Sequence, residues 1–497
     1  MGVFIFYFFC IFISQINAQL NDENWVFFRQ AFDGDPATIL NFKNKKLSIQ
    51  SKDPKGSLLS LGYTKATYSD SEGELALVCD GFSVYDKDLK LLPNGDSINF
   101  GQVWKDYQGI LYPDFGSAIF LPDPIDTNLV WLIHRSSEYG PQGYLDYNKL
   151  LFTLIRKIEG KYCVISKNNV FFNKSVFGSS LVSIKHANGR DWWIIQIKPK
   201  SNTYYFFLLN QSGIRFDHEQ SVGEVIQSVE NNSNSNDTYS QDGFKIAIYS
   251  NFSGIHLFDF DRFKGELSNS KFTPYKWKYP IVYGSVAFSP SGRFLYFNNA
   301  LRIIQYDLWR YKGELIHGDT VAYHDGLLEE FDNTYYGNML LGPDGRIYLC
   351  TAARGKNMHI IKNPDEESIN CNFVPKAFKL LGYNRSNSMP VIPSYRLGPM
   401  IGSHCDTLHH GIRDNYKFDL ITSPESDRLT IKYISGDLDS NMDLYMYSLD
   451  GRLISREFLS YFERKWEIDI TALVQGAYIY QIVSRDRILD RGKMIRY

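Results

Sequence analysis

One segment, HANGRDWW at residues 186–193, gathers an imidazole, a guanidinium, a carboxylate and two indoles. Its chemistry-bearing residues are His186, Arg190, Asp191, Trp192 and Trp193. On the rim of a binding site, the indole rings would stack on a sugar. The Asn-Gly pair inside the segment is also typical of a hairpin turn, and the two tryptophans would then open a strand. We favour this second interpretation, with a Trp ring packed between sheets and Arg190 paired with Asp191 or a neighbour.

Residue types that bind metals cluster in two places. His404, Cys405, His409 and His410 lie close together, but in a polar segment without Cys-x-x-Cys or His-Glu-x-x-His spacing. The stretch DLDSNMD at residues 437–443 places oxygen ligands at alternate positions, like half of a calcium loop. It lacks the glycine and the closing glutamate of such a loop. We therefore predict no metal site and no cofactor.

The remaining catalytic signatures are absent from the sequence. There is no Gly-x-Ser-x-Gly nucleophile elbow and no phosphate-binding glycine loop. Carboxylate pairs are common on any protein surface, and sequence alone does not bring two of them together. We predict no catalytic residues and no enzymatic activity.

The first residues, MGVFIFYFFCIFISQINA, form a short apolar run with a small-residue exit at Ala18. This pattern predicts a secretory signal peptide over residues 1–18, with an uncleaved anchor helix as the alternative. No later segment approaches the length of a membrane span. For an exported chain, we predict a disulfide between Cys371 and Cys405, with a Cys79–Cys163 pair as the weaker alternative.

Bulk composition narrows the class of protein. The chain has 497 residues, enough for a large core and a second unit. Aromatic residues make up 15% of the chain, and because aromatic side chains favour strands this content favours β structure. The formal net charge of −2 gives no sign of the excess positive charge that nucleic-acid-binding proteins carry.

Two stretches repeat one pattern, GSVAFSPSGRFLYFNNALRIIQYDL at residues 284–308 and GNMLLGPDGRIYLCTAARGKNMHII at residues 337–361. In both, apolar residues alternate on each side of a Pro-x-Gly-Arg turn, and another apolar strand follows. Alternation around a glycine turn predicts a β-hairpin. Four short strands recurring every ~40 to 55 residues are typical of β-propeller blades.

Looser copies of this pattern give six units between about Leu58 and Asp365. We expect NWVFFRQAFD (24–33) and NFVPKAFKLL (372–381) to supply a seventh blade together, closing the ring. The sequence thus predicts an all-β protein with a propeller of about seven four-stranded blades. Six or eight blades, or a pair of β-sandwiches, are the alternatives.

The C-terminal segment contains six or seven short strand patterns separated by turn residues, the right size for a small immunoglobulin-like β-sandwich. Its motifs SDRLTI, DLYMYSLDGRLI, IDITALVQGAYIYQI and the final GKMIRY occur in the order and place seen in the type A C-terminal sorting domain of the type IX secretion system of Bacteroidetes-type bacteria, which the segment resembles. Ser423-Pro424-Glu425 stands where that family has Asn-Pro. An ordinary immunoglobulin-like adhesive module is the alternative.

This resemblance implies export across the outer membrane by the type IX machinery, followed by removal of the domain or its use in surface attachment. The large region also resembles a group of secreted Bacteroidetes propellers, WD-repeat or quinoprotein-like, through HANGRDWWII, FSPSGRFLYF, YGNMLLGPDGRIYL, NCNF and SHCDTL. That likeness covers most of residues 20–410 and implies fold and location without chemistry. The expected domains are a signal peptide (1–18), a β-propeller (19–400), a linker (401–420) and a sorting domain (421–497).

We therefore expect a secreted or surface-attached binding module that recognises a protein or glycan. The alternative is an extracellular propeller enzyme acting on glycans at the mouth of the channel. Acidic or histidine side chains converging on one channel face would favour the enzyme, and an apolar face would favour binding. A structural part in a surface assembly is a third interpretation, which a large exposed apolar patch on the ring edge would favour.

Overall fold

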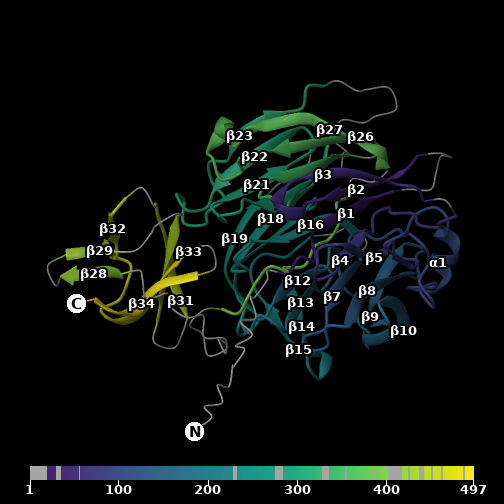
Figure 1. Cartoon of the computed structure of the whole chain (residues 1–497), viewed down its shortest axis with the longest axis horizontal. Coiled ribbons are helices and arrows are strands. Elements are labelled where there is room, and N and C mark those ends of the chain that lie inside the picture. Colours follow the sequence, from purple (N-terminus) through teal and green to yellow (C-terminus); the bar gives the residue numbers. More distant parts are fainter. Residues whose placement is uncertain are drawn as a thin grey trace, which may run out of the picture. The chain divides into compact units, whose positions relative to one another are not determined.

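The computed structural model describes residues 19–496 except 29–34, 55, 228–231, 275–283, 327–334, 353–354, 385–387, 401–416, 424–425, 436–440, 449–451, 461–462 and 485–486. The chain forms two compact units, Met1–Gly398 and Pro399–Tyr497. Figure 1 places β1, β4, β12 and β16 near the middle of the first unit, and β10, β15 and β23 at its rim.

The described part of the first unit contains seven consecutive sheets, which we number as blades 1 to 7. Blades 1 and 2 have three described strands each, β1 (Asn24–Phe27), β2 (Ala37–Asn41) and β3 (Ser48–Lys52), then β4 (Ala66–Ser69), β5 (Leu75–Cys79) and β6 (Val84–Asp86). Blade 3 contains β7 (Ala118–Pro122), β8 (Leu129–Tyr139), β9 (Leu145–Ile158) and β10 (Lys161–Phe172). Short helices are η1 (Lys43–Lys45), α1 (Gln102–Tyr107) and η2 (Ser368–Cys371).

The other blades follow the same antiparallel order. Blade 4 contains β12 (Val182–Lys185), β13 (Trp192–Ile197), β14 (Thr203–Asn210) and β15 (Gly213–Ser221). Blade 5 contains β16 (Asn232–Tyr239), β17 (Lys245–Ser250), β18 (Gly254–Asp261) and β19 (Glu266–Pro274), and β11 (Gly178–Ser179) adds to β16 in parallel. Blade 6 contains β20 (Ser285–Phe288), β21 (Phe294–Asn298), β22 (Arg302–Asp307) and β23 (Asp319–Tyr323). Blade 7 contains β24 (Tyr336–Leu341), β25 (Ile347–Thr351), β26 (Gly355–Ile361) and β27 (Phe373–Asn384).

The repeated Pro-x-Gly-Arg turns form the hairpins that their sequence predicts. Gly292 lies between β20 and β21 with φ of 71°, and Gly345 lies between β24 and β25 with φ of 81°. Both values fall in the left-handed region, which glycine adopts without steric cost. The repeat seen in the sequence is therefore the first hairpin of blades 6 and 7.

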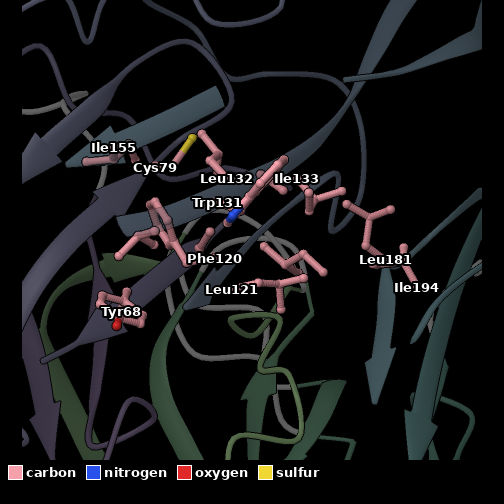
Figure 2. Close-up of a cluster of buried hydrophobic side chains, with 14 of the residues drawn as sticks. Tyr68, Cys79, Phe120, Leu121, Trp131, Leu132, Ile133, Ile155, Leu181 and Ile194 are labelled. Carbon is pink, nitrogen blue, oxygen red and sulfur yellow. The ribbon is translucent and has the colours of Figure 1, made fainter. Parts of the chain in front are cut away.

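Apolar side chains from neighbouring blades meet in continuous clusters. The largest cluster joins blades 2, 3 and 4, with Tyr68, Phe120 and Ile194 among its buried members (Figure 2). Others join blades 4 and 5, 5 and 6, 6 and 7, 7 and 1, and 1 and 2. Each sheet thus buries both faces against its neighbours, which is why a propeller needs a full ring of blades.

The ring does not close in the way the sequence predicts. We expected residues 24–33 and 372–381 to share a blade, but β1 pairs with β2, and β27 pairs with β26 as the last strand of blade 7. The expectation failed because an apolar strand pattern does not show which sheet the strand joins. Blades 1 and 7 meet instead through packed side chains and through Thr38 Oγ1, which accepts the Leu381 amide 2.9 Å away.

Blade 1 lacks an innermost strand among its described residues. The Asn24 amide at the start of β1 donates to Ser69 Oγ at the end of β4, and Phe28 just after β1 accepts the Leu61 amide ahead of β4, so β1 runs opposite to the innermost strand of blade 2. Its outer strand β3 is exposed, like β15 at the outer edge of blade 4. We infer that β1 to β3 correspond to the second, third and fourth strands of a complete blade.

A segment that follows blade 7, residues 388–398, lies against the inner strands of the ring. We call this segment the strap. It carries no regular secondary structure. Val391 donates its amide to the Lys65 carbonyl just before β4, and Ser394 donates its amide to the Ser183 carbonyl of β12. The strap therefore runs along the channel beside the innermost strands of blades 2 and 4.

The second unit is a β-sandwich. One sheet contains β28 (Lys417–Ser423), β29 (Ser426–Ser435) and β32 (Lys465–Asp469). The other contains β31 (Leu453–Leu459), β30 (Met442–Tyr447), β33 (Gly476–Ser484) and β34 (Arg487–Arg496). Leu429 and Trp466 of the first sheet share a buried core with Leu444 and Ile482 of the second. Every strand pattern recognised in this segment forms a strand.

The unit boundary at Gly398 lies two residues before the predicted end of the propeller at residue 400. Strand β28 begins at Lys417, inside the range predicted as a linker. The predicted signal peptide lies outside the described residues. Within residues 19–496, as far as they are described, no helix has both the length and the apolar content of a membrane span.

Candidate functional site: the central channel

Three basic side chains hold the strap in the channel. At its start, the buried Lys65 ammonium donates to the Ser388 carbonyl (3.0 Å) and to Ser388 Oγ (2.7 Å). At its end, Arg262 of blade 5 donates to the Gly398 carbonyl at 2.7 Å. Arg396 of the strap itself is the third. Both ends of the strap are therefore tied to the ring by charged donors, which make stronger hydrogen bonds than neutral ones.

Arg396 joins the strap to the N-terminal residues that precede β1. Its guanidinium donates to both carboxylate oxygens of Asp22 and to Glu23 Oε1, all at 2.7 Å. Burial raises the pKa of the Asp22 carboxyl above its usual value, although the neighbouring Arg396 opposes the rise. The planar guanidinium can donate to two carboxylates at once. This contact therefore positions the strap and also places a positive charge beside the two acidic side chains.

Two tyrosine hydroxyls anchor the middle of the strap. Tyr239 of blade 5 donates to the Ile392 carbonyl at 2.8 Å, and Tyr395 of the strap donates to the Phe120 carbonyl of blade 3 at 2.6 Å. Burial raises the pKa of both tyrosines well above the usual value. Both hydroxyls therefore keep their protons at neutral pH and act as structural donors.

A cavity of about 110 Å³ remains beside the strap. Most of its lining is apolar. The strap lines it with Met389, Val391, Ile392, Tyr395 and Leu397, among others. The ring lines it with residues 338–343 of β24 and its turn, Asp237, Thr238, Tyr239 and Gln241 of blade 5, residues 180–182 beside β12, residues 115–116 before β7, and Asp22. The channel thus offers an apolar slot bounded on one side by the chain's own strap.

The loop that contributes Phe115 and Gly116 to the cavity is fixed by a buried ion pair. Arg135 of β8 donates to Asp114 through Nε at 2.9 Å and through Nη2, and both side chains are 0% exposed. Its Nη1 donates to the carbonyls of Phe177 and Ser179, in the connection before β12 that contains β11. One guanidinium therefore positions two of the loops around the channel. Nothing in the local sequence signals this pair.

The HANGRDWW segment is a hairpin turn between β12 and β13. Asn188 Oδ1 accepts the amides of Arg190 and Asp191, and its Nδ2 donates to the Asp191 carboxylate. Asp191 thus pairs with Asn188, while the side chain of Arg190, which we expected to pair with Asp191 or a neighbour, is exposed. His186 Nε2 lies 3.1 Å from the Phe263 carbonyl of blade 5.

Both tryptophans of that segment pack between blades, as the structural interpretation predicts for at least one. Trp192 is 0% exposed and donates from Nε1 to the Pro122 carbonyl of blade 3, while Trp193 donates to the Arg262 carbonyl of blade 5. The two indoles therefore bond to blades on opposite sides of blade 4. None of the five candidate residues belongs to the described lining of the cavity.

Lys185, the last residue of β12, has an unusual environment that the sequence does not reveal. Its Nζ donates to the Gly189 carbonyl and lies 5.1 Å from the centre of the Trp192 ring. Burial and the charge of Arg262 lower the pKa of Lys185 to about 7.

The predicted cysteine and metal sites fall largely outside the described residues. Cys371 is buried and its expected partner Cys405 lies outside the described part, so their disulfide stays a prediction. The weaker Cys79–Cys163 pair does not form, since both are free thiols. The cluster around His404 also lies outside the description. In the described ranges no group of three or more His, Cys, Asp or Glu side chains is placed to hold a metal ion.

The second unit matches a family model described as a secretion system C-terminal sorting domain, over residues 423–495. The chain therefore carries a type IX sorting domain, which implies recognition by that secretion machinery and delivery to the exterior or to the outer-membrane surface. This finding confirms the resemblance seen in SDRLTI and in GKMIRY. No curated protein matches the chain.

Several solved structures are similar to the chain at low identity. One is a functionally unknown protein from Desulfotomaculum acetoxidans DSM 771 (12% identity, 75% of this chain and 99% of that chain, TM-score 0.40). Another is the Cps50 (Swd1) β-propeller domain of Myceliophteria thermophila (11%, 66% and 93%, TM-score 0.35). A third is the dihydro-heme d1 dehydrogenase NirN in complex with DHE (11%, 92% and 77%, TM-score 0.35).

Proposed function

We propose that this exported propeller is a non-catalytic binding module that holds a protein or glycan ligand at the central channel. The sorting domain accounts for export, and the seven blades supply a rigid frame for the loops that surround the channel. The cavity beside the strap is the binding site of this proposal. A second partner of the protein is the secretion machinery, which recognises the C-terminal sorting domain.

The observation that carries the proposal is the chemistry of the cavity lining. The slot is mostly apolar, as ligand sites commonly are, with a few polar groups at defined positions. Asp22 and Arg396 both line it, but each is engaged by the other. Tyr239 is held as a donor to the strap. No histidine belongs to the described lining. This lining supports recognition through apolar contact more than acid–base chemistry.

The test fills the slot from the ring side. Leu341→Trp places an indole at the end of β24, where the side chain lines the cavity. Leu381→Trp makes the same change on β27 of the same blade, at a side chain that is 39% exposed and does not line the cavity. Both full-length variants and the parent are measured against an array of bacterial surface glycans and a library of extended peptides.

We expect ligands that bind the parent to bind Leu341→Trp at least tenfold more weakly and Leu381→Trp unchanged. Chromatography of the bound glycans should show no cleaved product after prolonged incubation. Ligands that bind all three proteins equally would place the site away from the channel. If the parent releases a product and Leu341→Trp does not, the protein is an enzyme and the proposal of a non-catalytic binding module is wrong.

A further inference from the structure

The strap is held by side chains more than by strand pairing. Only two backbone hydrogen bonds link its amides to described residues of the ring, from Val391 and Ser394. Pro390 and Pro393 have no N–H to donate, so a regular ladder along the strap is impossible. The Lys65, Arg262 and Arg396 contacts described above supply the charged attachment instead.

The strap reaches most of the ring through apolar and aromatic contacts. Met389 belongs to the buried cluster that joins blades 1 and 7. Tyr395 packs edge-on against Trp192 of blade 4, and its ring centre lies 6.1 Å from that of Tyr68 in blade 2. Leu397 packs against the cluster of blades 4 and 5. One short segment therefore contacts elements far apart in the sequence.

The position of the strap explains how blade 1 completes the ring. Blade 1 has no described innermost strand, and the strap runs past its inner side, where Met389 and Ile392 join the cluster that contains Trp25 and Phe27. The strap follows blade 7 in the chain, while Asp22 and Glu23, which bind Arg396, precede blade 1. The two ends of the propeller are thus joined by a segment that belongs to neither terminal sheet.

We propose that the strap is a non-covalent latch, which the ring binds as a peptide in its channel whether or not the strap is joined to β27. The ligand is this chain's own segment, residues 388–398. The binding site is the channel face built by Lys65, Tyr239, Arg262 and the Asp22–Glu23 pair. This proposal stands without any external ligand in the cavity.

A consequence concerns the sorting domain. Among the described residues, the contacts that hold the strap involve positions up to Gly398, where the first unit ends. Cleavage beyond that point therefore leaves the latch seated. A break between β27 and the strap would leave the strap attached to the ring by non-covalent contacts alone.

The experiment uses the full chain with two engineered protease sites, one between Asn384 and Ser388 and one between Gly398 and Lys417. After both cuts, which a denaturing gel verifies, gel filtration separates the ring from released fragments. Mass spectrometry then measures how much of the strap peptide remains in the ring fraction. The second cut removes any contribution of the sorting domain to retention.

We expect the peptide to stay with the ring in the parent protein and to fall at least tenfold in Lys65→Met/Arg396→Met. The control, Lys43→Met/Arg310→Met, removes two cations from exposed ion pairs and should retain the peptide fully. Gel filtration and circular dichroism of the uncut methionine variant should match those of the parent, which separates a lost clamp from a misfolded ring. Immediate loss of the peptide from the parent, or equal retention by the methionine variant, would overturn the latch.

Discussion

Arg135 offers a strong test of how the channel loops are held. Substituting Arg135→Met removes a guanidinium that is fully buried and makes six hydrogen bonds, two to Asp114 and one each to four other acceptors. The methionine fills much of the same volume. The buried carboxylate of Asp114 then has no counter-ion, and burial already raises the pKa of Asp114.

The expected loss is about 3 to 5 kcal/mol of unfolding free energy, the usual cost of removing one partner of a buried ion pair. In Arg135→Met/Asp114→Asn the unpaired charge is gone. We expect that double variant to be more stable than the single one by about 1 to 3 kcal/mol, since the remaining penalty comes from carbonyls without donors.

Guanidinium unfolding followed by tryptophan fluorescence measures these values for the propeller, because seven of the eight tryptophans precede Gly398. The matched control is Arg156→Met, which breaks the Arg156–Asp126 pair in the same blade, with side chains 38% and 36% exposed. Exposed pairs contribute about 0 to 1 kcal/mol. Equal losses in Arg135→Met and Arg156→Met would refute the structural role assigned to the buried pair.

Three further outcomes follow from buried groups. Burial lowers the pKa of His134 to about 3, so below pH ~6.5 the unfolded chain binds a proton at this residue that the folded protein does not, and stability falls. His134→Gln should reduce the loss of unfolding free energy between pH 7 and pH 5 by about 2 kcal/mol. Denaturant unfolding at both pH values measures this difference. Burial raises the pKa of Asp80 to about 6, so its contribution to stability falls as pH rises from ~4 to about 6. Asp80→Asn should remove that slope from denaturant unfolding measured across this pH range. Trp192→Ala should cost about 3 to 5 kcal/mol in thermal and chemical unfolding, while Arg190→Ala, at an exposed side chain, should change stability by less than about 0.5 kcal/mol. A stability loss above about 1 kcal/mol in Arg190→Ala would contradict the assignment of that side chain to solvent.

The features that sequence predicts well here are local. The Pro-x-Gly-Arg turns fix the first hairpins of blades 6 and 7 because a glycine with positive φ and alternating apolar residues act within ten or so positions of one another. The Asn188-Gly189 turn likewise places both tryptophans at the start of β13. The strands of the sorting domain follow from the same short-range patterns.

The features that sequence misses depend on distant partners. The strap, SMPVIPSYRLG, has no strand alternation and contains two prolines, so it resembles a linker. Its partners lie far away in the chain: Lys65 and Ser388 are separated by 323 positions, and Asp22 and Arg396 by 374. The error in ring closure has the same origin, because the pattern of β27 fits its own blade as well as a shared one. The cavity beside the strap could not be predicted without that closure.

Hydrogen exchange of the full-length protein tests the central claim, that residues 388–398 close the ring from inside the channel. Mass spectrometry of the peptide covering the strap should show protection at the hydrogen-bonded amides of Val391, Ser394, Tyr395 and Leu397, with exchange much slower than that of the exposed turn at residues 140–144. Strap exchange that is complete at the earliest time point, together with the turn, would contradict the account.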